Sequence, residues 1–306
     1  MELKEYQKTT LKQIKNYLQL LDKEKGLGNL RHASMDAWNA LGLKPYKERQ
    51  NGLGQDLSNF CLKIPTGGGK TFLAVKSIDL INSIYRKRRT GLILWIVPTN
   101  QIYQQTIKNL KNREHPYRQH LDIASGGRTS ILEKTDRFSP MDIEENLVVL
   151  MLMLPSANRK TKEALRIFKD NGGFQSFFPP EDEITKHGEL LSKLPNLDTY
   201  GEIDGFWQRQ IKTSLGNTLR ILSPLIILDE GHKAYSEQAQ ETLRGFNPCM
   251  ILELSATPSE ESNILVDIKG KRIETKKIEF EKIKKIKKEE KENEKRRNKK
   301  NRRKRN

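Results

Sequence analysis

The stretch that decides the fold is Pro65–Thr71, which reads Pro-Thr-Gly-Gly-Gly-Lys-Thr. It follows a short apolar segment, Phe60–Ile64, with the length of a buried strand. Helical periodicity resumes directly afterwards, over residues 71–86. A strand, a glycine-rich loop and a helix in this order let backbone N–H groups surround phosphate groups at the start of the helix.

The residue types within this loop fit a nucleotide and a magnesium ion. Small residues let the backbone approach the phosphates, Lys70 would reach the outer phosphates, and the Thr71 hydroxyl would contact Mg²⁺. We therefore predict a site for ATP and Mg²⁺. A glycine-rich turn with a solvated lysine is the alternative, and the flanking strand and helix count against it. The predicted nucleotide-binding residues in the loop are Thr66, Gly67, Gly68, Gly69, Lys70 and Thr71.

A pair of acids forms the second candidate, Asp229-Glu230-Gly231-His232, directly after the apolar run Leu225–Leu228. An aspartate at a strand end can hold magnesium, and the glutamate beside it can orient and deprotonate an attacking water. An Asp-Glu pair alone is usually a solvated loop, but the strand before it favours chemistry. We predict that Lys70, Asp229 and Glu230 are catalytic and that Thr71 and Asp229 hold the metal.

The third candidate is Ser255-Ala256-Thr257, which follows the apolar run Met250–Leu254 and precedes Pro258. Small hydroxyl residues at a strand end can bond to His232 and relay the state of the nucleotide. By itself the pattern favours a simpler structure, in which a serine or threonine caps the start of a helix.

Apolar runs alternate with amphipathic helical segments along the chain, which predicts an α/β fold with a mainly parallel, doubly wound sheet. Groups at the carboxyl ends of such strands meet at one edge. Helices are also expected over residues 6–25, 30–41 and 101–111. The predicted strands are Phe60–Ile64, Leu92–Val97, Leu121–Ser125, Leu147–Leu154, Leu225–Leu228 and Met250–Leu254.

We divide the chain into three parts: a helical segment at 1–57, the α/β domain at 58–270 and a basic tail at 271–306. Residues 158–222 read as an insertion within the domain. The formal net charge is +17, but the tail holds +12 of it, so bulk charge says little about the folded body. Low complexity predicts that the tail is disordered or a charged helix.

Composition limits the cellular location and the partners that we expect for the protein. No apolar run approaches the ~18 residues that cross a bilayer, and no apolar core of a signal peptide follows the first methionine. The two cysteines, Cys61 and Cys249, lie far apart and suggest neither a disulfide framework nor a metal site. We expect a cytoplasmic protein without a membrane partner.

Taken in order, four motifs resemble the first motor domain of superfamily-two DEAD/DEAH-type helicases. They are Pro-Thr-Gly-Gly-Gly-Lys-Thr, Val-Pro-Thr-Asn, Asp-Glu-Gly-His and Ser-Ala-Thr-Pro. Ile-Leu-Asp-Glu-Gly-His-Lys-Ala-Tyr and Leu-Glu-Leu-Ser-Ala-Thr-Pro bring the chain closest to the Res subunit of type III restriction enzymes. Ile64 replaces the glycine of the strict phosphate-loop pattern, as the helicase form of the loop allows. The resemblance spans Leu3 to Gly270.

The resemblance implies a RecA-like P-loop NTPase fold and hydrolysis of Mg-ATP coupled to DNA. It assigns adenine recognition to Gln7, for which an exposed helix position is the alternative. It assigns the coupling role, which is to relay the state of the nucleotide, to His232, Ser255 and Thr257. Nucleic-acid contacts fall to Pro98, Thr99 and Asn100, and a second contact at Arg128 competes with a plain turn at residues 125–128.

Members of this family use two motor domains, and only the first is recognisable here. An arginine from the second accelerates phosphoryl transfer by ~10³–10⁵ in related systems. We therefore expect the front part of a longer enzyme, with weak turnover alone. DNA is the expected partner and RNA stays open, and a methyltransferase subunit or a chain carrying the second motor domain would complete the assembly. The alternative is a non-catalytic remnant that its basic tail holds on nucleic acid.

Overall fold

The computed structural model describes residues 3–153, 167–169, 172–200, 210–231 and 236–269. A compact unit, Met1–Asp267, is distinct from a second unit that begins at Ile268. The main sheet of the compact unit has seven strands in the order β3-β4-β2-β7-β8-β1-β9, and every neighbouring pair is parallel. The strands are β1 (Ser58–Lys63), β2 (Gly91–Val97), β3 (Thr129–Glu133), β4 (Leu147–Met153), β7 (Leu225–Asp229), β8 (Met250–Ser255) and β9 (Ile264–Asp267).

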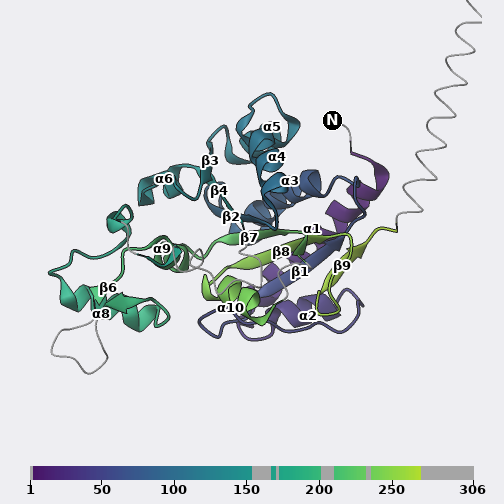
Figure 1. Cartoon of the computed structure of the whole chain (residues 1–306). Coiled ribbons are helices and arrows are strands. Elements are labelled where there is room, and N and C mark those ends of the chain that lie inside the picture. The colour runs from purple at the N-terminus through teal and green to yellow at the C-terminus, as the bar shows by residue number, and fades with distance from the viewer. Residues whose placement is uncertain (1–2, 154–166, 170–171, 201–209, 232–235, 270–306) are drawn as a thin grey trace, which may run out of the picture. The chain divides into compact units, whose positions relative to one another are not determined.

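Helices cover both faces of this sheet, which confirms the predicted doubly wound α/β fold. Helices α3, α4 and α5 lie on one side of the strands and α10 lies on the other (Figure 1). Helix α1 packs against α2 and α3, so the N-terminal segment folds within the same unit. The helices are α1 (Glu5–Gly26), α2 (Ala33–Asn39), α3 (Lys70–Leu80), α4 (Asn100–Lys111), α5 (Pro116–Ser125), α6 (Pro140–Glu145), α8 (Ile184–Lys193), α9 (Leu215–Leu222) and α10 (Glu237–Gly245).

Strand β2, at the centre of the sheet, is apolar along its whole length because both of its faces are buried. Every residue of β2 is buried. Leu92, Leu94 and Ile96 share one core with residues of α6, α9 and α10. Strand geometry turns Ile93 and Trp95 to the opposite face, where α4 contacts β2 and β4. The sheet therefore lies between two apolar layers, and the ends of its strands are the places where polar site residues can gather.

The predicted strand at Leu121–Ser125 is wrong, because these residues form the last part of helix α5. Pro116 occupies the first turn, and the His115 side chain accepts a hydrogen bond from the Tyr117 amide. Gly126 ends the helix in the left-handed conformation, with a φ of 69°. The apolar run is one face of a short amphipathic helix, which a five-residue window does not distinguish from a strand.

Two edge strands were not predicted. Strand β3 pairs only with β4, and four of its five residues are half-buried. Strand β9 pairs only with β1 and has four residues. An edge strand has one partner and less apolar surface to bury, so its sequence carries a weaker pattern than that of a central strand.

The helix predicted over residues 71–86 changes type partway. Helix α3 ends at Leu80, and a π-helical segment, η1 (Ile81–Arg86), follows before Lys87 terminates it with a φ of 52°. Helix α2 is shorter than the predicted 30–41. The insertion contains α8, α9 and a two-stranded hairpin of β5 (Thr199–Tyr200) and β6 (Gln210–Ile211).

Several of the predicted features lie wholly or partly outside the described residues. They include Leu154 of the predicted fourth strand, parts of the insertion, and the tail at 271–306. None of the helices among the described residues has the length and apolar character needed to cross a membrane.

Replacing Leu94 with alanine should lower the free energy of unfolding by ~2–5 kcal/mol, because the side chain is fully buried in the central strand. Urea denaturation measures the change. The control is Ile123→Ala on α5, where the side chain is 73% exposed and the effect should stay within ~0.5 kcal/mol. Equal losses in the two variants would contradict the assignment of the core.

Candidate nucleotide-binding site

The loops after β1, β7 and β8 meet at one edge of the sheet, because the three strands are parallel neighbours in register. Lys63 at the end of β1 is paired with Ser255 at the end of β8. Asp229 at the end of β7 is paired with Leu254. The Ile64 amide donates a hydrogen bond of 2.9 Å to the Ser255 carbonyl oxygen. The three predicted motifs therefore converge at this carboxyl edge.

The glycine loop owes its shape to two residues in the left-handed region. Gly67 has a φ of 74° and Gly69 a φ of 79°, a conformation that only glycine adopts routinely. Gly69 is the N-cap of α3, so Lys70 begins the helix. Within the loop, the Gly68 amide donates to the Pro65 carbonyl oxygen at 2.9 Å. The loop thus turns tightly and opens onto a helix N-terminus, as anion binding requires.

The loop lysine contacts the second acid of the Asp-Glu pair. Lys70 Nζ forms an ion pair with Glu230 Oε1, and the two side chains are only 11% and 19% exposed. Glu230 itself has a φ of 51°, which is uncommon for a residue with a side chain. Strain at this position is consistent with a backbone held by its surroundings.

Asp229 is buried beside this ion pair, with 6% of its surface exposed. Its Oδ1 accepts a hydrogen bond of 3.0 Å from the Glu230 amide. Burial raises the pKa of Asp229 to about 6, and the neighbouring Lys70 opposes this rise without cancelling it. The carboxylate is therefore ionised at neutral pH at a cost in stability.

Gln7 is buried, so the alternative of an exposed helix position is wrong. It is 2% exposed, and its Oε1 accepts a hydrogen bond from the Lys4 amide at 3.0 Å. A Cβ atom built on Gly69 would lie 2.9 Å from Gln7 Nε2. The neighbouring Tyr6 donates its hydroxyl to the Gly68 carbonyl oxygen at 2.8 Å. Helix α1 therefore places two side chains directly against the glycine loop.

The loop at Ser255–Pro258 does not begin a helix, so the predicted alternative of a helix cap is wrong. The Ser255 hydroxyl accepts a hydrogen bond from the Thr257 amide at 3.2 Å, and the chain then runs through turns to β9. Ser255 is buried and Thr257 is exposed. His232 lies outside the described residues. Thr66 is exposed and Thr71 half-buried in the glycine loop.

Sequence reasoning missed one buried acid at this edge. Glu253 in β8 is 1% exposed and accepts hydrogen bonds from Asn59 Nδ2 at 3.1 Å and Ser262 Oγ at 3.0 Å. A Cβ atom on Gly231 would lie 3.4 Å from the Glu253 Cβ atom, so this side chain supports the loop after Glu230. The available signal was a charged residue in the middle of an apolar strand.

The candidate nucleic-acid residues do not come together. Thr99 and Asn100 are exposed at the carboxyl end of β2, where the Thr99 hydroxyl caps α4, and Pro98 beside them is half-buried. Arg128 precedes β3, and its carbonyl oxygen accepts from the Leu147 amide at the start of β4. Because the strands are parallel, Arg128 lies at the amino edge, and a seven-residue strand puts roughly 20 Å between the two edges.

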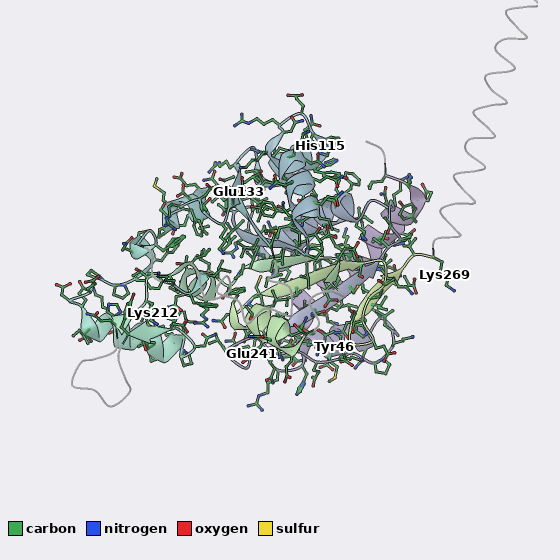
Figure 2. The ribbon with its side chains drawn as sticks, in the orientation of Figure 1. Tyr46, His115, Glu133, Lys212, Glu241 and Lys269 are labelled. Carbon is green, nitrogen blue, oxygen red and sulfur yellow. The ribbon has the colours of Figure 1, made fainter. Side chains whose placement is uncertain are left out.

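Helix α4 is fixed to the end of β3 through Glu133, which Figure 2 labels together with His115 at the start of α5. The Tyr103 hydroxyl donates to Glu133 Oε2 at 3.0 Å, and Lys111 Nζ lies 2.6 Å from Oε1. Lys111 lowers the pKa of Glu133, whereas burial and this carboxylate raise the pKa of Tyr103. These contacts position the helix whose first residue is Asn100.

The all-parallel sheet with helices on both faces, and with the glycine loop after β1 and the acid pair after β7 at one edge, is a RecA-like α/β fold. The family model described as "Type III restriction enzyme, res subunit" matches residues 1–260. The chain belongs to this family. No curated protein matches it.

Two solved structures are similar to the chain. One is a nuclease-deletion mutant of the Type ISP restriction-modification enzyme LlaGI in complex with a DNA substrate mimic, with 14% identity and a TM-score of 0.40. The match covers 91% of this chain and 21% of that one. The other is the helicase domain of Pyrococcus furiosus Hef, with 17% identity, a TM-score of 0.30, and coverage of 67% of this chain and 30% of that one. The chain thus spans less than a third of either structure.

Gly69→Ala should destabilise the protein more than Gly67→Ala, by ~1 kcal/mol or more in urea denaturation. Both substitutions carry the cost of a left-handed backbone, but only the Gly69 position faces another atom, Gln7 Nε2. Adding Gln7→Ala to Gly69→Ala should remove the excess. An equal cost for the two glycines would show that Gln7 does not press on the loop.

Asp229→Asn should stabilise the protein at pH 7 by roughly 2–3 kcal/mol and leave stability unchanged near pH 3, below both pKa values. The folded-state pKa of about 6 exceeds the ordinary value of 3.8, so the wild type binds more protons folded than unfolded and loses stability as pH rises between them. Urea denaturation at several pH values measures the difference. The control is Glu260→Gln, which removes an exposed carboxylate. A stability profile for Asp229→Asn that runs parallel to the wild-type profile at every pH would refute the burial cost.

Proposed function

We propose that the chain is the ATP-binding motor domain of a DNA helicase or translocase, in which hydrolysis of Mg-ATP is coupled to DNA. The observation that carries this proposal is the ion pair between Lys70, in the loop after β1, and Glu230, in the loop after β7, at the carboxyl edge of the sheet. Membership of the res-subunit family supports the same function.

The chemistry of the site fits a nucleotide. The left-handed Gly67 and Gly69 leave backbone room for phosphates, and the N-terminus of α3 provides free N–H groups and a favourable dipole. Lys70 supplies a cation for the outer phosphates. Gln7 and Tyr6 stand against the loop, and we assign adenine recognition to Gln7.

The donor set fits magnesium as well. The Thr71 hydroxyl follows Lys70 directly, and the Asp229 carboxylate is next to its partner Glu230. Mg²⁺ in such sites takes one or two protein oxygens and completes its shell with phosphates and water. Among the described residues no group of three or more His, Cys, Asp or Glu could hold a metal by itself. When bound, the ion neutralises charge that develops on the phosphate oxygens.

Glu230 and Lys70 change partners in the proposed reaction. With ATP present, Lys70 Nζ binds the outer phosphates instead of Glu230 Oε1. Glu230 then orients the attacking water and accepts its proton. The ion pair thus keeps both groups near their working positions before the substrate arrives.

We assign coupling to Ser255, Thr257 and His232, and DNA contact to Pro98, Thr99 and Asn100. The bond from the Ile64 amide to the Ser255 carbonyl oxygen supports coupling, because it ties the start of the glycine loop to the end of β8. We propose that full turnover needs an arginine from a second motor domain. Among the described residues, the other sheet is only the β5–β6 hairpin. RNA in place of DNA, and a methyltransferase subunit as partner, remain open within this proposal.

Lys70→Ala should abolish binding of a fluorescent ATP analogue, because the phosphates lose their cation. Glu230→Gln should keep that binding but slow single-turnover hydrolysis in the presence of DNA by ~10²–10⁴. Lys76→Ala, which removes a cation from the same helix away from the loop, is the matched control and should change neither quantity. Unaltered nucleotide affinity in Lys70→Ala would overturn the assigned site.

A further inference from the structure

A row of arginines lies at the amino edge of the sheet, away from the nucleotide site. Four consecutive basic residues, Arg86–Arg89, connect η1 to the start of β2. Arg128 stands before β3 at the same edge. We call the exposed Arg88, Arg89 and Arg128 the basic edge.

Most of the positive charge in this row is not paired with a carboxylate. Lys87 pairs with Asp22 at 2.8 Å. In contrast, Arg88, Arg89 and Arg128 are exposed and form no ion pair with any residue that the structure describes. The basic edge therefore presents a positive surface to solvent.

The guanidinium groups are brought together by two glycines. A Cβ atom on Gly91 would lie 2.7 Å from Arg86 Nη2 and 3.2 Å from Arg88 Cζ, so both groups pack on this one residue. A Cβ atom on Gly126 would lie 3.9 Å from Arg89 Nη1. Gly91 is level with Thr129 across β4, and two strand spacings amount to ~10 Å. The side chains of Arg86, Arg88 and Arg89 thus extend from the start of β2 to Gly126, two positions before Arg128.

The inner part of this row is energetically unfavourable in the protein alone. Arg86 Nε and Nη2 and Asn82 Nδ2 are buried and have no hydrogen-bond partner among the described residues. Burial, together with Arg88, lowers the pKa of Arg86 to about 10. Buried donors without partners and like charges side by side both cost stability, and such groups call for an explanation.

The attraction of cations to a helix C-terminus does not account for the whole row. Cations near a helix C-terminus are favourable, which explains Arg86 and Lys87 at the end of η1. Arg89 instead reaches across to Gly126, and Arg128 belongs to the connection between α5 and β3. Two separate segments therefore contribute to one charged surface.

We propose that the basic edge binds the phosphate backbone of nucleic acid, as a second contact on the opposite edge of the sheet from Pro98–Asn100. This inference rests on the proposed DNA motor function. Arginine forks match phosphate oxygens in pairs, and a row of them follows a backbone without reading its sequence. An acidic protein is the less suitable partner, because protein interfaces have an apolar or aromatic core and few charges at their centre.

The test compares two full-length variants that lose the same charge. One is Arg88→Ala with Arg89→Ala and Arg128→Ala. The control is Lys12→Ala with Lys15→Ala and Lys44→Ala, three exposed lysines on α1 and in the loop after α2. The affinity for a labelled DNA duplex is measured by fluorescence anisotropy over a range of salt concentrations. The basic tail is common to all the proteins, so its contribution cancels in the comparison.

The arginine variant should bind DNA at least tenfold more weakly near 100 mM salt, with a log-affinity slope against log salt that is smaller by about 2–3. Each lost phosphate contact removes ~0.9 from that slope. The lysine variant should retain the wild-type slope. Equal slopes in the two variants would overturn the inference. So would an arginine variant that no longer binds polyglutamate but binds DNA normally, since the edge would then serve an acidic protein.

Two further measurements keep the outcomes distinct. Thermal unfolding shows whether the arginine variant is folded, and Arg128→Ala alone provides a milder substitution with an expected slope change of ~0.9. Binding of a fluorescent ATP analogue should be the same in every variant. Loss of ATP binding in the wild type would refute the proposed function, whereas normal ATP binding with unchanged DNA slopes would refute only the role of the basic edge.

Discussion

The parallel register of β7, β8 and β1 is the constraint on which the rest of the site depends. Because these strands are neighbours and run the same way, the loops that follow them emerge at one edge. Lys70 and Glu230 are 160 positions apart in sequence and still form an ion pair. Two apolar layers hold the strands in place, so the site inherits the rigidity of the core rather than that of a loop.

The site carries costs that the core must offset. Asp229 is ionised although buried, Glu230 has a left-handed backbone, and the buried Glu253 needs Asn59 and Ser262 as partners. Stability sacrificed at a site is typical where chemistry requires charge in a water-poor place. A second energetic cost lies at the amino edge, where Arg86 Nε and Nη2 are buried without a hydrogen-bond partner among the described residues.

Much of the fold could be predicted because the central strands are buried on both faces. Their continuous apolar runs stand out, and five of the six predicted strands exist. Leu121–Ser125 failed because a short apolar face looks alike in a helix and in a strand. The edge strands β3 and β9 were not predicted because a strand with one partner needs little apolar surface. The insertion, part of which is described, has no periodicity strong enough to define its elements.

The sequence alone predicted the kind of site, since glycines, a lysine, a hydroxyl and two acids after apolar strands allow few other chemistries. Tertiary structure decided which residues share it. Helix α1 buries Gln7 against Gly69, a contact that depends on packing over 62 positions and not on local pattern. Arg128 was grouped with Pro98–Asn100 by sequence, but strand direction places it at the opposite edge. The order of the motifs can be read along the chain, whereas the parallel pairing of the strands decides at which edge of the sheet each residue lies.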